Sequence, residues 1–284
     1  MKIFDMHIHV NSKNIEQNYL LEQMEKAGVY GGGLISCPPE EATAALLKMP
    51  FKERIENVLG WKKGYEGRIF AGLFVHPEEK DVCLKVQEAK NEGIDFFKVI
   101  CDTMPAYEKP CMELLSAIEK TNKPVMFHSG ILYSGTDTSR FNRPANWESL
   151  LNLKNLIFSL AHCSWPWHDE CLAVYGKFLH YYNSNKGSEM YLDTTPGTPK
   201  IYRKDLLYKI FNIGYDIENN IMFGTDSIAT DYNAEWVKGW LALDGQIMDE
   251  MNISEGVRRK YYNENYMRFL KCQDIDHRLP QINK

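Results

Sequence analysis

The segment IFDMHIH, residues 3–9, carries two histidines separated by one residue within a short apolar stretch. Such a stretch is typical of a buried β-strand, whose side chains alternate between two faces, so His7 and His9 share one face. In a barrel that face points inward, where each of two neighbouring imidazoles needs a polar partner. A metal ion would satisfy both imidazoles at once, although His-x-His pairs also occur on ordinary strands.

Short apolar or β-branched runs alternate along the chain with longer segments of helical period, which is the pattern of repeated βα units. We predict eight strands, at Ile3–His9, Gly32–Ser36, Ile69–Val75, Phe96–Cys101, Val125–His128, Leu156–Ala161, Met190–Thr194 and Ile221–Gly224. We predict amphipathic helices at Ile15–Ala27, Asp81–Glu92, Pro110–Thr121, Asp169–Tyr182, Ala234–Asp249 and Ser254–Leu270.

Eight βα units within 284 residues match the size of a (β/α)8 TIM barrel. Because no linker rich in Pro, Gly or Ser divides the chain, we expect residues 1–284 to form a single domain. Residues 38–68 are expected to form an enlarged connection after the second strand. Residues 129–147, which are polar, are expected to form a loop after the fifth strand.

The composition excludes several classes of protein. A hydrophobic content of 44% and a charged content of 25% indicate an ordinary globular core. The formal net charge of −5 argues against binding to a phosphate backbone. The sequence contains neither a secretion signal nor an apolar run approaching the roughly 18 residues of a membrane span, and its seven cysteines form no Cys-x-x-Cys pair. We therefore expect a cytoplasmic protein that acts on a small molecule, without nucleic acid or membrane partners.

Three further polar residues lie where predicted strands end. His128 ends the fifth strand, His162 follows the sixth and Asp226 follows the eighth. Barrel enzymes place their reactive groups at these carboxyl ends of the strands. Four of the eight histidines in the chain are therefore expected to converge with one aspartate at one mouth of the barrel.

These motifs, in this order, resemble the amidohydrolase superfamily, specifically the mononuclear branch that includes aminocarboxymuconate-semialdehyde decarboxylase and related metal-dependent hydrolases. The resemblance extends from Asp5–His9 to Tyr262–Leu270, so it spans nearly the whole chain. It implies one divalent metal ion, zinc or alternatively manganese, with the ligands His7, His9, His128 and Asp226. It also implies that His162 lies beside the metal, and the family raises the expectation of a homodimer.

The residue types suit the chemistry that the resemblance implies. Neutral imidazoles and a carboxylate are common ligands of Zn²⁺, which lowers the pKa of water to about 7. Asp226 would accept the proton of that water, and His162 would stabilise negative charge on the substrate. The alternatives are a helix cap for Asp226 and a bond to a backbone carbonyl for His162.

Lys98, on the fourth predicted strand, adds a further alternative. In binuclear members of the superfamily a carboxylated lysine on that strand bridges two metals, so a second ion is the lesser hypothesis here. The favoured interpretation is an inward ammonium near the site, which would contact substrate, or a strand-end residue that reaches solvent. The other candidates for substrate binding are His76 at the end of the third strand, Arg140 and Arg143 in the loop after the fifth, and Trp165 after His162.

Several functions are compatible with these residues. The leading hypothesis is a hydrolase in which metal-activated water attacks an amide, lactone or ester carbonyl. The alternative is a non-oxidative decarboxylase of a small aromatic or unsaturated carboxylic acid, which would use the same metal, imidazole and carboxylate. A metal-dependent nuclease and a non-catalytic ligand-binding barrel are the weaker hypotheses, because a nuclease would need an additional acidic ligand where the chain has His76 and Lys98.

Overall fold

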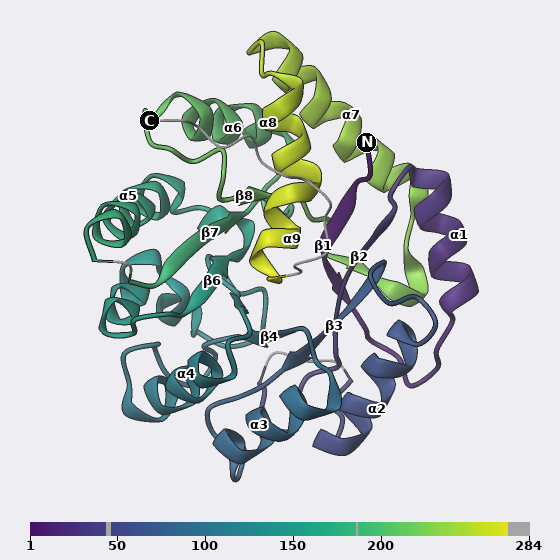
Figure 1. Cartoon of the computed structure of the whole chain (residues 1–284), viewed down its shortest axis with the longest axis vertical. Coiled ribbons are helices and arrows are strands. Elements are labelled where there is room, and N and C mark those ends of the chain that lie inside the picture. The colour runs from purple at the N-terminus through teal and green to yellow at the C-terminus, as the bar shows by residue number, and fades with distance from the viewer. Residues whose placement is uncertain (44–46, 186, 272–284) are drawn as a thin grey trace, which may run out of the picture.

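The computed structural model describes residues 1–43, 47–185 and 187–271. Its central feature is a parallel sheet that curls into a ring, with helices around the outside (Figure 1). The strands follow one another around the sheet in chain order, apart from the last piece, which lies beside the first strand. They are β1 (Phe4–His9), β2 (Gly31–Ile35), β3 (Ile69–Phe74), β4 (Phe96–Val99), β5 (Val125–Phe127), β6 (Ile157–Leu160), β7 (Glu189–Asp193), β8 (Ile221–Met222) and β9 (Ser227–Ile228).

The ring closes through an eighth strand position that is split into two pieces. β8 pairs with β7, and β9 pairs with β1. Between these pieces, Met6 N donates to Phe223 O at 3.1 Å and Asp226 N donates to His7 O at 2.9 Å. The predicted (β/α)8 TIM barrel is thereby confirmed. The strand predicted at Ile221–Gly224 is wrong in its extent: β8 ends at Met222, and strand pairing resumes at Ser227, after a turn in which Asp226 has a φ of +60°.

Most of the helices form the outer layer around the strands, and α8 and α9 follow the last strand. The helices are α1 (Gln17–Ala27), α2 (Phe51–Lys62), α3 (Val82–Glu92), α4 (Lys109–Thr121), α5 (His168–Asn185), α6 (Arg203–Asn212), α7 (Ala234–Glu250), α8 (Glu255–Arg259) and α9 (Asn265–Phe269). The expected connection 38–68 contains α2, which the periodicity did not reveal because Arg54 and Asn57 occupy its buried face. There the two terminal nitrogens of Arg54 donate to Glu79, at 2.5 Å, and to the carbonyl of Phe74.

Two features differ from the expected repeat of one helix per strand. After β5 the chain forms two 3₁₀ segments, Ser139–Asn142 and Pro144–Asn152, in place of a long helix. The predicted helix Ser254–Leu270 is confirmed as a helical segment, but a π-helical turn at Lys260–Glu264 separates α8 from α9. In Figure 1 α9 lies across the centre of the ring.

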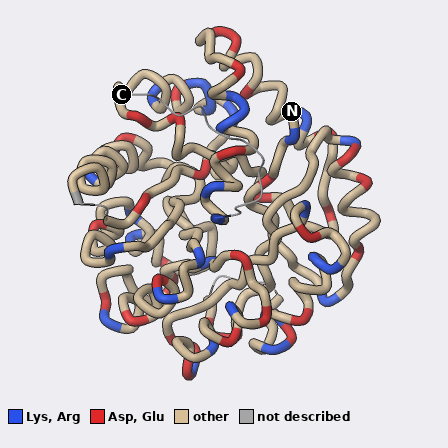
Figure 2. The backbone as a smooth tube through the Cα atoms, viewed as in Figure 1, with Lys and Arg blue, Asp and Glu red and all other residues tan. Residues whose placement is uncertain are grey.

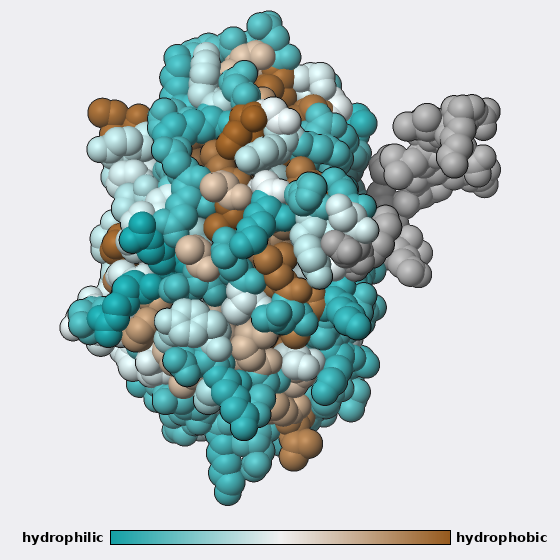
Figure 3. Space-filling model, turned by 90° about the vertical axis from the view of Figure 1, so that its left-hand side faces the viewer, coloured by the Kyte–Doolittle hydropathy of each residue, from teal (hydrophilic) through white to brown (hydrophobic). Residues whose placement is uncertain are grey.

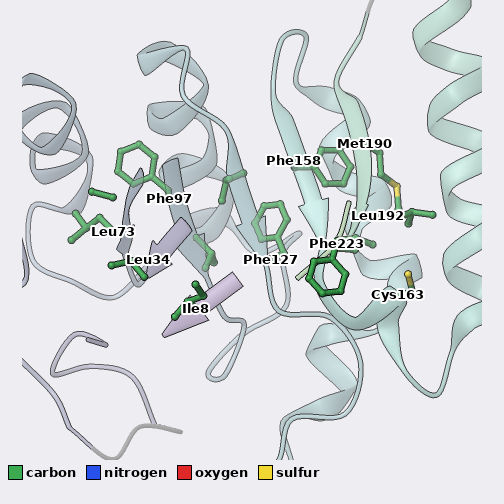
Figure 4. Close-up of a cluster of buried hydrophobic side chains, with 14 of the residues drawn as sticks. Ile8, Leu34, Leu73, Phe97, Phe127, Phe158, Cys163, Met190, Leu192 and Phe223 are labelled. Atoms are coloured by element: carbon green, nitrogen blue, oxygen red, sulfur yellow. The ribbon is translucent and has the colours of Figure 1, made fainter. Parts of the chain in front are cut away.

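Buried side chains form two layers. The outer layer lies between the strands and the surrounding helices, and each of the strands β1 to β8 contributes at least one side chain to it (Figure 4). Its members in that view include Ile8, Leu34, Leu73, Phe97, Phe127, Phe158, Leu192 and Phe223. The inner layer brings Phe4, Met6 and Phe70 of the first strands against Tyr266 and Phe269 of the last helical segment. The last helical segment therefore plugs the end of the barrel at which the strands begin.

The surface carries charges of both signs, mixed around the ring, and Figure 2 shows no basic stripe in the part of the chain that is described. In the view of Figure 3, apolar residues form a broken band between hydrophilic ones. Among the described residues, no helix is both long and apolar enough to span a membrane. The six described cysteines form no disulfide, and Cys272 lies outside the described residues.

Candidate metal centre

A β-bulge in β1 aims both of its histidines into the barrel. Asp5 pairs with Gly32 and Ile8 pairs with Leu34, so β1 has one more residue than β2 over this interval. Met6 therefore belongs to the inner layer and Ile8 to the outer one, while His7 and His9 line a cavity at the carboxyl ends of the strands. The bulge also explains why Asp5 stays outside this cavity, although a strict alternation would place it with the histidines.

Asp5 instead fixes the turn that carries Asp226. The Asp5 carboxyl accepts hydrogen bonds from Thr225 N at 2.9 Å, from the Thr225 hydroxyl and from Tyr232 Oη at 3.0 Å. Burial raises the pKa of Asp5 to about 7, against the effect of these hydrogen bonds. Asp226 is the next residue after Thr225 and has a left-handed backbone, a strained conformation that tends to occur at functional sites.

Three side-chain atoms from these two elements lie close together. His7 Nε2 is 3.1 Å from His9 Nε2 and 3.5 Å from Asp226 Oδ1, and His9 Nε2 is 3.1 Å from Asp226 Oδ1. Ligand atoms at tetrahedral corners around Zn²⁺, each at 2.0–2.1 Å from the metal, are about 3.3 Å apart. The spacing therefore fits a single metal ion, and within the described residues this is the one group of at least three such side chains.

The protonation states also suit a metal. Burial, together with the Lys98 ammonium, lowers the pKa of His7 well below its ordinary value, and burial does the same for His128. These imidazoles are therefore neutral near pH 7 and can offer a lone pair. Burial opposes ionisation of Asp226, but its hydrogen bond to His9 and the neighbouring His7 hold its pKa below the usual range. The cluster thus presents two imidazoles and one carboxylate.

Two further predicted residues line the same cavity without joining the cluster. His128 Nε2 lies 3.2 Å from Ile131 O, and its Nδ1 makes no hydrogen bond to any residue that the structure describes. His162 Nδ1 lies 3.2 Å from Thr195 O, at a distance where it donates to that carbonyl and leaves Nε2 on the opposite side of the ring. The His162 ring centroid is 5.6 Å from that of His7 and 5.1 Å from that of His128.

His162 is presented by a turn with an unusual backbone. His162, Cys163 and Ser164 all have positive φ, at 60°, 40° and 61°. The turn is held by contacts with the loop after β5, where Ser164 Oγ is 2.7 Å from Ser129 Oγ and Ile131 N donates to Trp165 O at 2.8 Å. The two loops that carry His128 and His162 are therefore tied together.

The cavity has a volume of about 180 Å³. Lys98 and Trp165, both predicted to contact substrate, lie in its wall. Lys98 is fully buried, and its Nζ lies 3.5 Å from His7 Nε2. The remaining lining residues are mostly apolar and include Ile100, Ile131 and Leu132. The site thus combines a metal-type cluster, a separate imidazole, a buried cation and an apolar wall.

The structure does not bring the other predicted substrate contacts into this cavity. His76 is buried, and its Nε2 lies 2.8 Å from Asp102 Oδ1. Arg140 pairs with Asp137 at 2.8 Å and Arg143 pairs with Glu170 at 2.8 Å, and both guanidinium side chains are more than half exposed. The reason is local: the 3₁₀ segment Ser139–Asn142 turns these arginines outward and buries Asn142 in their place.

Sequence reasoning missed three residues that support the site. Asp193 ends β7, and its Oδ2 lies 2.8 Å from His7 Nδ1. Gly197 lies so close to His162 that a Cβ would meet its ring at 2.9 Å. Asn142 bonds both backbone groups of Cys101 and accepts from Gly130 N. Of these three, only Asp193 could have been predicted from the sequence, because it is an acidic residue at the end of a predicted strand.

The barrel and the three-residue cluster define a (β/α)8 protein with a candidate metal site at the carboxyl ends of its strands. A family model described as amidohydrolase matches residues 5–271, so the chain belongs to the amidohydrolase family. No curated protein gives a significant match.

Solved structures share this fold at low sequence identity. A probable 2-pyrone-4,6-dicarboxylic acid hydrolase from Acinetobacter baumannii, solved with citric acid bound, is 13% identical, with a TM-score of 0.63 over 95% of this chain and 100% of that one. A TIM-barrel protein from Bordetella bronchiseptica is 15% identical, with a TM-score of 0.66 over 95% and 99%. The 5-carboxyvanillate decarboxylase from Sphingomonas paucimobilis is 12% identical, with a TM-score of 0.62 over 95% and 99%. Similar barrels thus include a hydrolase and a decarboxylase.

Proposed function

We propose that this protein is a metal-dependent hydrolase of a small molecule, with one zinc ion, or alternatively manganese, held by His7, His9 and Asp226. The observation that carries the proposal is the spacing of 3.1–3.5 Å among the three ligand atoms. His128 is the proposed fourth ligand, since it lines the same cavity and its Nδ1 has no partner among the described residues.

A bound zinc ion would supply Lewis-acid chemistry, polarising a carbonyl and lowering the pKa of water to about 7. The Asp226 carboxylate, ionised at neutral pH and 34% exposed to the cavity, would accept the proton from the attacking water. His162 holds its Nδ1 against Thr195 O, so its Nε2 is the atom available to stabilise the carbonyl oxygen or to move a proton. The apolar wall would exclude competing water.

A decarboxylase is the second candidate, and Lys98 is the observation that favours it. A buried ammonium in the cavity wall suits a substrate with a carboxylate, and Trp165 offers an aromatic surface for a planar ring. Two of the similar barrels act, according to their names, on carboxylated compounds. A nuclease is less well supported, because Asp102, the acidic residue after β4, bonds His76 and Thr43 outside the cavity.

Elemental analysis of the purified protein tests the metal site. We expect about one divalent ion per chain in the wild type and its loss in the double variant His7→Ala/His9→Ala. The matched control is His76→Ala, which removes a buried histidine that does not line the cavity. Absence of a divalent ion after metal-replete expression, or its retention in the double variant, would overturn the proposal.

Substrate profiling then separates the two activities. The metal-loaded protein would be offered panels of lactones, esters, amides and aromatic carboxylic acids, with product formation and CO₂ release measured in parallel. Hydrolysis without CO₂ supports the first candidate, and CO₂ release from an acid supports the second. Tight ligand binding without turnover of any compound would indicate a non-catalytic barrel.

A further inference from the structure

One charged side chain, that of Lys98, faces the cavity without an ion pair to a described residue. Lys98 is 1% exposed, and among the described residues it makes no ion pair within 4.0 Å. Its one contact at hydrogen-bond distance is His7 Nε2, at 3.5 Å, an atom that the proposed metal would take. Lysine is almost never fully buried unless it is paired, so the ammonium of Lys98 calls for an acceptor that does not come from the chain.

The charges around the cavity point to an anion as that acceptor. Asp226 is the one carboxylate among the lining residues, and Asp193 stands behind His7. A divalent ion and the Lys98 ammonium would bring three positive charges against these two carboxylates. A buried positive excess is costly unless an anion neutralises it.

The cavity has room for one such anion, with an apolar body. Lys98 is the one lysine or arginine in the cavity lining, and the nearby Arg140 is outside and paired with Asp137. The volume of about 180 Å³ is below the roughly 300–1,000 Å³ of common ligand pockets. Ile100, Ile131 and Leu132 form an apolar surface beside the cation.

We infer that the substrate is a small monocarboxylate, with its carboxylate held by Lys98 and its apolar body against Ile100, Ile131 and Trp165. The inference deepens the proposed function and rests on it, because the reacting group would then lie next to the cluster of His7, His9 and Asp226. A second carboxylate on the substrate would find no further lysine or arginine in the wall.

Calorimetric binding to the purified protein, metal-loaded and metal-free, tests this inference. The probes are benzoate, benzamide and isophthalate, which present one carboxylate, none and two on the same ring. We expect benzoate to bind at least 10-fold more tightly than either of the others. Lys98→Met should abolish the preference and Lys98→Arg should retain it, while Lys177→Met, at an exposed lysine paired with Glu148, should change nothing.

Retention of the benzoate preference in Lys98→Met would overturn the inference, and so would its loss in Arg140→Met. A carboxylated Lys98 with a second metal equivalent, read by mass spectrometry and elemental analysis, would also overturn it, because the amine would be consumed. If Lys98→Met does not fold, protection of Lys98 from reductive methylation by benzoate in the wild type decides, and no protection contradicts the inference. The metal assay is independent: a metal-free wild type that still needs Lys98 for benzoate binding would reject the proposed function alone.

Discussion

His7 Nδ1 and Asp193 Oδ2 are 2.8 Å apart, and both side chains are fully buried. The two residues are 186 positions apart in the chain, and β1 and β7 bring them together. At this distance the imidazole donates its Nδ1–H to the carboxylate, which places the lone pair on Nε2, the atom that faces His9 and Asp226. Such a carboxylate partner orients a metal-binding histidine and raises its basicity.

Replacing Asp193 with asparagine should therefore weaken metal binding by roughly 10- to 100-fold. The Asp193 carboxylate accepts both from His7 and from Thr195 N, at 2.7 Å, so an amide would turn its NH₂ toward one of these donors. Competition with a chelator measures the affinity. Asp102→Asn removes another buried carboxylate that pairs with a histidine, outside the cavity, and should leave the affinity unchanged. Equal affinities of wild type and Asp193→Asn would refute the assigned role.

Gly197→Ala tests the position of His162 without removing its imidazole. A Cβ at residue 197 would lie 2.9 Å from Cγ and 3.0 Å from Nδ1 of His162, so the ring must shift. We expect turnover of the substrate found by profiling to fall by roughly 10- to 100-fold, because displacements of this size are costly in catalysis. Metal content should not change.

The matched control for Gly197→Ala is Gly245→Ala in α7, where a Cβ would meet nothing within 4 Å. Unchanged turnover in Gly197→Ala would show that the position of the His162 ring does not matter to the reaction. Loss of the metal in that variant would instead place His162 among the groups that hold it.

The sequence allowed the barrel and the cluster to be predicted because both depend on short-range patterns. Strand period, helix period and a polar residue after each strand are visible within a few residues, and the parallel ring then brings His7, His9 and Asp226 to one mouth. The helix α2 was missed because Arg54 interrupts its apolar face, and that arginine is explained only by Glu79, which is distant in sequence.

Other features depend on the closed ring itself. The bulge in β1 exists as a register difference with β2, so no pattern within β1 alone reveals it. Arg140 and Arg143 follow a strand that ends at the cavity, yet the burial of Asn142 turns them away from it. The contact between Asp193 and His7 requires the first and seventh strands to share one interior.

Asn142 should contribute strongly to stability, because its side chain is the partner of two backbone groups at the end of β4. Its Nδ2 donates to Cys101 O at 2.8 Å, and its Oδ1 accepts from Cys101 N at 3.3 Å. An unsatisfied buried polar group costs about 1–3 kcal/mol, so Asn142→Ala should lower the free energy of unfolding by about 2–4 kcal/mol in urea titrations. Asn146→Ala, at a more exposed asparagine that bonds Arg140 O and Phe141 O, should cost less. Equal costs would contradict the role of Asn142.

His168 should make the stability of the barrel depend on pH. It is 5% exposed, and burial, with Lys209 nearby, lowers its pKa to about 4 from 6.5. The unfolded chain takes up the proton near pH 6.5, whereas the folded protein resists it until about pH 4. The contribution of His168 to the free energy of unfolding is therefore complete above pH 6.5 and is lost progressively as the pH falls toward 4. This difference between the pKa of His168 in the unfolded and folded chains corresponds to about 3 kcal/mol of stability.

The comparison that isolates this effect is between wild type and His168→Gln, each unfolded in urea at pH 7.5 and pH 4.5 without metal. Burial also lowers the pKa of His7 and His128 and raises that of Asp5, and these effects cancel in the difference between the two proteins. We expect the wild type to lose about 2–3 kcal/mol more than the variant between the two pH values. His180→Gln, at an exposed histidine of the same helix, should behave as wild type. If the stability difference between wild type and His168→Gln is the same at both pH values, His168 takes up its proton equally in the folded and unfolded chains.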